Sequence, residues 1–263
     1  MTDRVKTILG IDLEGINLNL IEDGVNLKKD RVIEIGAVLW DCHFNQPIKF
    51  LSELINEPDR LPISEEVEEL TGINDNMLDM WGHPKEHIPR ILEQLTELVN
   101  KADAIMAHNG NMYDKPMLLE LYKRFKMDFP EKLWIDSAQH IEFPRTIPGK
   151  SMPILEHAHG FINPFPHRAV TDVMAMFKIA SNYSFQRMYQ LANSPVVQLI
   201  AVLDAPNWRD HKEVEEFNRI KHRVSKSRFR WQPDIKKWIK EVPKILVDEG
   251  KCDYEFDFYI KEI

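Results

Sequence analysis

The sequence predicts an α/β protein, with a mixed β-sheet that carries helices on its faces and a small α+β appendage at the C-terminus. Three observations lead to this fold class. Strand-like runs dominate the first fifty residues, helical and strand-like runs then alternate, and a C-terminal part with a basic, aromatic segment begins near residue 195. With 263 residues, 43% of them hydrophobic, the chain can bury a substantial core.

The N-terminal part is expected to form an antiparallel meander of three strands. Residues 7–11 form an apolar run that predicts a buried strand ending at Asp12. A polar, Asn-rich stretch over 16–30 is expected to form a long loop or a loose hairpin. The Val- and Ile-rich segment 31–40 and the segment 46–51 predict the second and third strands.

Helices and strands alternate in the middle of the chain. Ser64 followed by two glutamates is typical of a capped helix start, and apolar residues recur at helical spacing in several later segments. We expect helices from 64, over 84–100, over 111–126 and from 168 to about 188, and strands over 102–107 and 133–135.

The C-terminal part is expected to be a separate small domain. Residues 193–206 resemble a boundary, so we divide the chain into domains 1–194 and 195–263. The second would hold a helix over 208–220 and strands over 238–242 and 254–260.

Composition narrows the class of protein. No segment approaches the roughly 20 apolar residues of a membrane span, and no signal peptide is evident, so we expect a cytoplasmic protein without a membrane partner. Cys42 and Cys252 lie far apart and predict free thiols. The net charge of −8 argues against a protein that coats DNA, although residues 219–240 hold nine Lys/Arg against one acid.

Asp12 and Glu14 stand two residues apart at the end of the first strand, so their carboxylates point to the same side. Mg²⁺ and Mn²⁺ prefer carboxylate oxygens, which suggests a metal site. Taken alone, the pair fits a solvated strand end as well.

Two further acidic signals follow. Asp114 starts a helix directly after an apolar strand, at the kind of junction where α/β sheets gather their sites, although an acid also simply favours a helix N-terminus. His167 and Asp172 open the last long helix at a spacing that brings both side chains to one face. A capping His and a surface acid are the alternative.

Taken in order, these motifs resemble the DnaQ-like, or DEDDh, 3′–5′ exonucleases. The matching segments are Asp12-Leu13-Glu14, His108-Asn109 with Tyr113-Asp114, and His167 with Asp172, supported by residues 31–37 and 70–73. The resemblance covers residues 6–190. It implies a ribonuclease-H-like, mixed five-stranded sheet flanked by helices.

The resemblance also implies a two-metal site. Asp12, Glu14, Asp114 and Asp172 would hold two divalent ions, Mg²⁺ or Mn²⁺, and His167 would act as general base, because an unperturbed histidine titrates near pH 6.5. The expected reaction is hydrolysis that releases nucleoside 5′-monophosphates from a 3′ end. The motif residues expected to contact nucleic acid are Leu13, Gly15, His108, Asn109 and Tyr113.

The sequence departs from the family pattern at two places. Gly15 stands where members often carry Thr or Ser near the terminal nucleotide, which puts that sugar contact in doubt. The segment 15–30 is longer than the usual link, and we consider both a rim of the substrate groove and a neutral insertion.

Cations and aromatic rings alternate in the tail, a pattern that can hold phosphates and stack bases. The candidate contacts are Arg228, Arg230, Trp231, Lys237 and Trp238. The alternative is a small domain whose rings form its core.

The leading hypothesis is therefore an exonuclease of DNA 3′ ends that favours single strands. The alternatives are a 3′–5′ exoribonuclease, a degenerate nucleic-acid-binding fold and a proofreading subunit of a polymerase. A homodimer stays open, because some members of the family are dimers.

Overall fold

The computed structural model describes residues 4–16, 25–144 and 146–263. The chain forms two compact units, Met1–Ala192 and Asn193–Ile263. Residues 17–24, half of the segment 15–30, lie outside the described residues, and so does the rim of the substrate groove expected there. None of the helices in the described ranges is long and apolar enough to cross a membrane.

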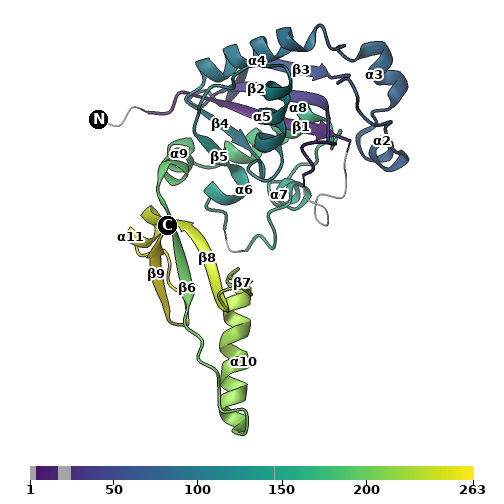
Figure 1. The fold of residues 1–263 in the computed structure, drawn as a ribbon. Helices are drawn as coiled ribbons and strands as arrows, with labels where there is room; N and C mark the ends of the chain where they lie inside the picture. Colours follow the sequence, from purple (N-terminus) through teal and green to yellow (C-terminus); the bar gives the residue numbers. More distant parts are fainter. Residues whose placement is uncertain (1–3, 17–24, 145) are drawn as a thin grey trace. The chain divides into compact units, whose positions relative to one another are not determined.

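The larger unit is built on a mixed five-stranded sheet in the order β3-β2-β1-β4-β5 (Figure 1). Strands β1 (Thr7–Gly15), β2 (Val32–Asp41) and β3 (Gln46–Leu54) form the predicted antiparallel meander. Strands β4 (Ala104–Ala107) and β5 (Trp134–Asp136) continue the sheet in parallel with β1. The predicted fold class is confirmed.

Strand β1 is longer than expected, and the extension matters for function. It continues past Asp12 to Gly15, in register with β2 up to the pair Glu14–Glu34. Both acids therefore belong to the strand itself rather than to a loop after it, and the regular strand geometry fixes their directions.

Helices cover both faces of this sheet. On one face α4 (Ile88–Lys101) and α5 (Asp114–Arg124) pack against Leu9, Ile11 and Leu13. On the other face, α8 (Ala169–Ala180) and α9 (Phe185–Asn193) pack against Ile8 and Met106 of the sheet. Phe177 of α8 is part of this cluster. Smaller helices complete the unit: α2 (Glu65–Thr71), α3 (Asp75–Trp81), α6 (Ser137–His140) and α7 (Met152–Ala158).

One long helix predicted from 168 to about 188 is instead two helices. α8 ends at Ala180, and Ser181 caps it before α9 starts at Phe185. The side chain of Asn182 donates to the carbonyls of Lys178 and Ile179, which satisfies orphan acceptors at the helix end. The prediction of a single helix was wrong because local capping ended it.

The smaller unit holds a four-stranded antiparallel sheet in the order β7-β8-β6-β9. Its elements are β6 (Val196–Ala201), α10 (His211–Lys226), β7 (Arg230–Gln232), β8 (Lys237–Pro243), α11 (Lys244–Asp248) and β9 (Phe258–Glu262). Residues 193–206, in which we expected a domain boundary, include β6, which pairs with both β8 and β9.

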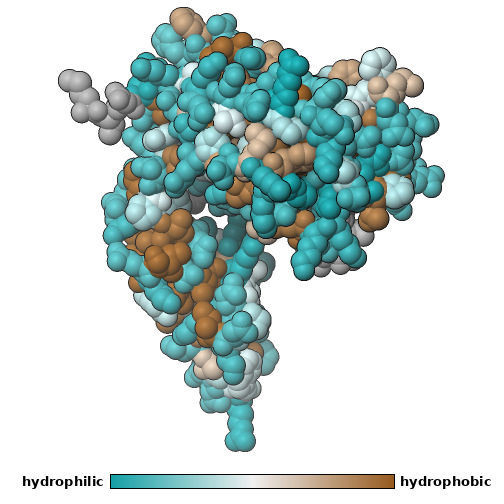
Figure 2. Space-filling view, turned by 45° about the horizontal axis from the view of Figure 1, so that its top comes forward, coloured by the Kyte–Doolittle hydropathy of each residue, from teal (hydrophilic) through white to brown (hydrophobic). Residues whose placement is uncertain are grey.

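The core of the smaller unit gathers Leu199, Val224, Phe229 and Val242, with Tyr254 and Phe256 stacked beside them. Much apolar surface remains exposed in this unit, for example at Val196 and Tyr259. Figure 2 shows a hydrophobic area over the smaller unit, whereas hydrophilic residues dominate the visible face of the larger one.

Candidate active site

The site begins at the carboxyl-terminal half of β1. Residues Ile8, Gly10, Asp12 and Glu14 alternate onto the face covered by α8, since the space beside Gly10 is filled by Val173 and Phe177 of that helix. Asp12 and Glu14 therefore point together toward the start of α8, as the spacing predicted.

Asp114 reaches the same region from the first residue of α5. It is 3% exposed, and its Oδ1 accepts a hydrogen bond of 3.0 Å from the backbone N–H of Leu13. This bond ties the start of α5 to β1 between the two strand acids. The carboxyl end of β4 and the helix after it thus supply the third acid.

The start of α8 supplies the remaining two predicted residues. Oδ2 of Asp172 accepts from the backbone N–H of His167 at 3.1 Å, and its Oδ1 accepts from the amide of Asn163 at 2.5 Å. The backbone N–H of Asn163 in turn donates to the buried carboxylate of Glu156 at 2.8 Å. The carboxylate of Asp172 is therefore held from both sides.

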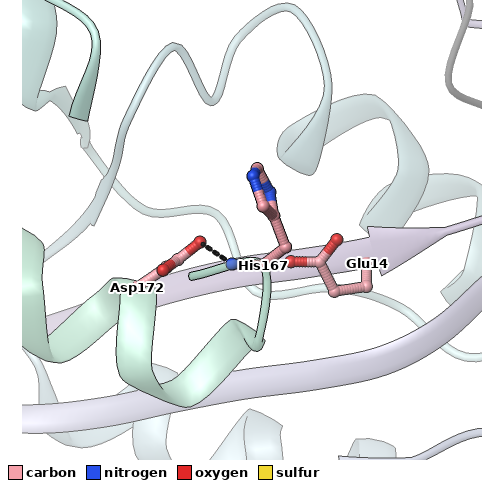
Figure 3. Close-up of side chains that lie close together, drawn as sticks. All are labelled: Glu14, His167 and Asp172. Carbon is pink, nitrogen blue, oxygen red and sulfur yellow. Dashed lines mark hydrogen bonds between the residues drawn. The ribbon is translucent and has the colours of Figure 1, made fainter. Parts of the chain in front are cut away.

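Figure 3 shows how Glu14, His167 and Asp172 meet. One ligand atom of each lies within 4.8 Å of the others, which is the spacing of groups able to hold one metal ion. A cavity of about 90 Å³ lies beside them, lined in part by Asp12, His108 and Asp172. Asp12 thus shares one small cavity with a member of the cluster.

The electrostatics of the acids call for a cation. Burial, followed by repulsion from the neighbouring acids, raises the pKa of Glu14 to about 8 and that of Asp12 well above its usual value. Burial also raises the pKa of Asp114 to about 7 and that of Asp172 to about 6. Divalent cations would offset both the energetic cost of burying the charged carboxylates and the repulsion between them. The donor set therefore fits hard metal ions.

The predicted contact residues from the second motif surround the acids. Nδ1 of His108 lies 2.8 Å from Oγ of Ser137, while its buried Nε2 makes no geometrically well-formed hydrogen bond with the described part of the chain. Asn109 adopts a left-handed φ of 58°, and its backbone N–H donates to Asp136 at 3.1 Å. Asp136 and Ser137 thus fix the loop that carries both residues.

The departure at Gly15 has a local explanation. A Cβ at this position would lie 2.1 Å from the hydroxyl of Tyr113. The phenol therefore occupies the space that the usual Thr or Ser side chain would need. Burial, followed by nearby Asp114, raises the pKa of Tyr113 well above its usual value.

Several residues that shape the site carry no signal in the sequence. Asn163 and Glu156 act through contacts that only the folded loop before α8 creates. Glu34 was visible only as part of the supporting motif 31–37. A buried charge in a Val- and Ile-rich strand was the one available hint, because such a charge needs a partner.

In the tail, the predicted cations and rings separate onto different faces. Trp231 pairs with Trp238 across β7 and β8, with ring centroids 5.8 Å apart, and Trp238 packs against the core. Arg230 and Lys237 alternate with these rings and so point to the opposite face of the sheet. Arg228 precedes β7 with a left-handed φ of 64°.

Comparison with known proteins places the site in a family. The RNase T exonuclease family matches residues 9–180. Among curated proteins, no sequence match was found.

Solved structures share the fold at low sequence identity. The nuclease domain of 3′hExo, a DEDDh family member bound to rAMP, superposes with a TM-score of 0.54 and 18% identity over 68% of this chain and 91% of that one. A 3′-exonuclease that recognises the 3′ end of a histone mRNA stem-loop gives a TM-score of 0.55 and 17% identity, over 68% and 82% of the two chains. E. coli exonuclease I with a dT13 oligonucleotide gives 0.56 and 17%, over 75% and 48%.

The family match spans β1 to the end of α8, and the structural likeness extends over the same ribonuclease-H-like sheet. The chain therefore belongs to the RNase T exonuclease family and is an enzyme with nuclease activity.

Proposed function

We propose that this protein is a metal-dependent 3′–5′ exonuclease that releases nucleoside 5′-monophosphates from DNA 3′ ends, with single strands favoured. The observation that supports it best is the meeting of Glu14, His167 and Asp172 within 4.8 Å, beside Asp12 and Asp114. A nuclease needs both a place for cations and a proton acceptor, and this cluster offers both within one site.

In this proposal Asp12, Glu14, Asp114 and Asp172 would hold two divalent ions, Mg²⁺ or Mn²⁺. When bound, such ions stabilise negative charge on the attacking and the leaving oxygen. Asp114 is already anchored to β1 and Asp172 is held by Asn163, so the protein sets these carboxylates in place before any ion arrives.

His167 would take the proton from the attacking water at a ring nitrogen. Its side chain is exposed, which lets it meet water and substrate, while its backbone is tied to Asp172. A positioned histidine of this kind contributes typically 10²–10⁴-fold to rate. The phosphodiester breaks at the leaving 3′-oxygen, which regenerates a 3′ end on the shortened strand.

A 3′–5′ exoribonuclease is the second candidate. One similar structure is of a 3′-exonuclease that recognises an mRNA stem-loop, and another is of a nuclease domain bound to rAMP. The structure with dT13 favours DNA in the same way. The acids and His167 serve both reactions, so the substrate must be decided by experiment.

We also propose that residues 195–263 form a domain that binds single-stranded nucleic acid. Arg230 and Lys237 are exposed and lie on the same face of the small sheet, and Trp231 is 46% exposed on the other face. Such cations can bind phosphates, and such rings can stack on bases.

The test uses single-stranded DNA, double-stranded DNA and RNA, each labelled at either end, with Mg²⁺, Mn²⁺ or EDTA. A 3′–5′ exonuclease gives a ladder from the 5′ label and an immediate mononucleotide from the 3′ label, only with metal. If no substrate is cleaved with either metal, the proposal is refuted. Asp12→Ala should abolish cleavage, and His167→Ala should lower the rate while metal binding persists. Asp128→Asn, which removes an exposed acid, serves as the matched control.

A further inference from the structure

The general base of the proposed site has no partner that orients its ring. Within residues 4–16, 25–144 and 146–263, the hydrogen bond of His167 runs from its backbone N–H to Asp172, and none reaches the imidazole (Figure 3). The direction of the ring is therefore set by the backbone that carries it.

That backbone is in an unfavourable conformation. His167 has a φ of 59°, in the left-handed region that costs a residue with a Cβ about 1–2 kcal/mol. Such a conformation persists only when the surrounding structure holds it. Thr171 contributes on the helix side, because its hydroxyl donates to the carbonyls of Phe165 and Arg168.

The strongest restraint comes from Glu34 on β2. Its carboxylate, which is 1% exposed, accepts from the Arg168 guanidinium at 2.8 Å through Nη2 and at 3.2 Å through Nε. It also accepts from the backbone N–H of Ala169 at 2.9 Å. The side chain of Arg168 does not cap α8. Glu34, a residue of strand β2, instead caps the N-terminus of that helix.

The same segment is pressed against the sheet. A Cβ at Gly36 would lie 2.3 Å from backbone atoms of Ala169 and Val170, so the first turn of α8 sits directly on β2. Glu34 and Gly36 together fix the two residues after His167 in position and direction.

The position of Glu34 is electrostatically unfavourable. It faces Glu14 in the strand register, and its charge is among the causes, after burial, that raise the pKa of Asp12 and Glu14. Three acids within a few residues of β1 and β2 repel one another. Glu34 is not one of the four acids proposed to hold metal, so its burial needs another purpose, and its bonds to Arg168 and Ala169 provide one.

We infer that Glu34 and Arg168 are positioning residues for His167: their ion pair clamps residues 168 and 169 and thereby aims the imidazole at the attacking water. This inference rests on the proposed function. A different role for Arg168, whose side chain is 37% exposed, would be direct contact with a substrate phosphate. The two roles differ in what they change, because a positioning residue acts on kcat and a phosphate contact acts on KM.

The test is a double-mutant cycle on the full chain. Glu34→Gln and Arg168→Gln are made in the wild-type and in the His167→Ala background, and kcat and KM are measured for the best substrate. Positioning predicts a loss in kcat of about 10- to 100-fold with unchanged KM in the first background, and no further loss in the second. An equal loss in both backgrounds, or a salt-dependent rise in KM without loss of kcat, would overturn the inference.

The matched control is Glu57→Gln. Glu57 is also buried and accepts from an arginine fork, Arg124, and from a backbone N–H, that of Val32, so its loss removes the same kinds of bond. It has no contact with α8 among these bonds. Its variant should lose stability like Glu34→Gln but keep kcat.

A second measurement does not depend on activity. The Cε1–H resonance of His167 is assigned in histidine-labelled protein by its absence from His167→Ala. In Glu34→Gln it should move toward the free-imidazole position and narrow, while Glu57→Gln leaves it in place. An unmoved resonance in Glu34→Gln refutes positioning even if the wild-type protein cleaves nothing, whereas inactivity with a moved resonance refutes only the proposed function.

Discussion

Replacing Asp114 by asparagine should stabilise the metal-free protein at pH 8. Burial raises the pKa of this carboxyl to about 7 from an ordinary value of 3.8. A group whose pKa is raised by folding stabilises the folded state fully below its unfolded pKa and loses that contribution as the pH rises through the folded pKa. At pH 8 wild-type Asp114 is ionised in both states, and the folded state bears the whole cost.

The size of the effect follows from the shift. About three pKa units correspond to ~4 kcal/mol at 1.36 kcal/mol per unit. At pH 5 the folded carboxyl is protonated, and only the part of the shift between 3.8 and 5 remains, so the advantage of Asp114→Asn shrinks by ~2–3 kcal/mol. An asparagine Oδ1 can still accept from the N–H of Leu13, so the local structure is kept.

Urea denaturation in EDTA, followed by circular dichroism at pH 5 and pH 8, measures this difference. Asp128→Asn, which removes one exposed charge, controls for net charge. Adding Mg²⁺ at pH 8 should stabilise the wild type more than Asp114→Asn, because the ions would offset the repulsion that the variant lacks. If Asp114→Asn is no more stable than wild type at pH 8, or keeps the same advantage at pH 5, the account of the acidic site is refuted.

Three further outcomes follow from the described contacts. Gly15→Thr should cost ~1–3 kcal/mol of stability in the wild type through its clash with the Tyr113 hydroxyl, and less in a Tyr113→Phe background, which lacks that hydroxyl; an equal fall of the melting temperature in both backgrounds would contradict the packing. Asn163→Ala should raise the Mg²⁺ concentration for half-maximal activity by about 10- to 100-fold, since it frees Asp172; an unchanged metal titration would show that Asn163 does not orient this carboxylate. Removing residues 195–263 should weaken binding of single-stranded DNA and flatten its salt dependence while single-turnover cleavage persists; unchanged affinity would exclude the tail from substrate binding.

How far the sequence predicts the fold can be traced to particular elements. The antiparallel meander was predictable because residues 31–40 are rich in Val and Ile. Side chains of this strand pack into the hydrophobic clusters on both sides of the sheet. Strand β6 was missed because residues 193–206 resemble a boundary between domains. Its strand character comes from pairing with β8 and β9, which are more than thirty residues away.

The residues of the candidate site also differ in how far the sequence predicts them. The proximity of the acids and His167 could be expected because their motifs, taken in order, resemble those of an exonuclease family. Glu34 and Asn163 could not be assigned a role, because their partners are distant in the chain or lie in an irregular loop. The alternation of Arg230 and Trp231 was readable as a pattern, but the side of the sheet that each faces depends on where the core forms.

The order of strands has a consequence for biosynthesis. β1 is made first but lies at the centre of its sheet, and its parallel neighbour β4 starts only at Ala104. The last acid, Asp172, is made later still, within α8. Since non-local pairings of this kind form only once both partners exist, a growing chain cannot assemble the acidic cluster before α8 has been made. In the proposed mechanism, a chain that ends before α8 would therefore lack part of its metal site.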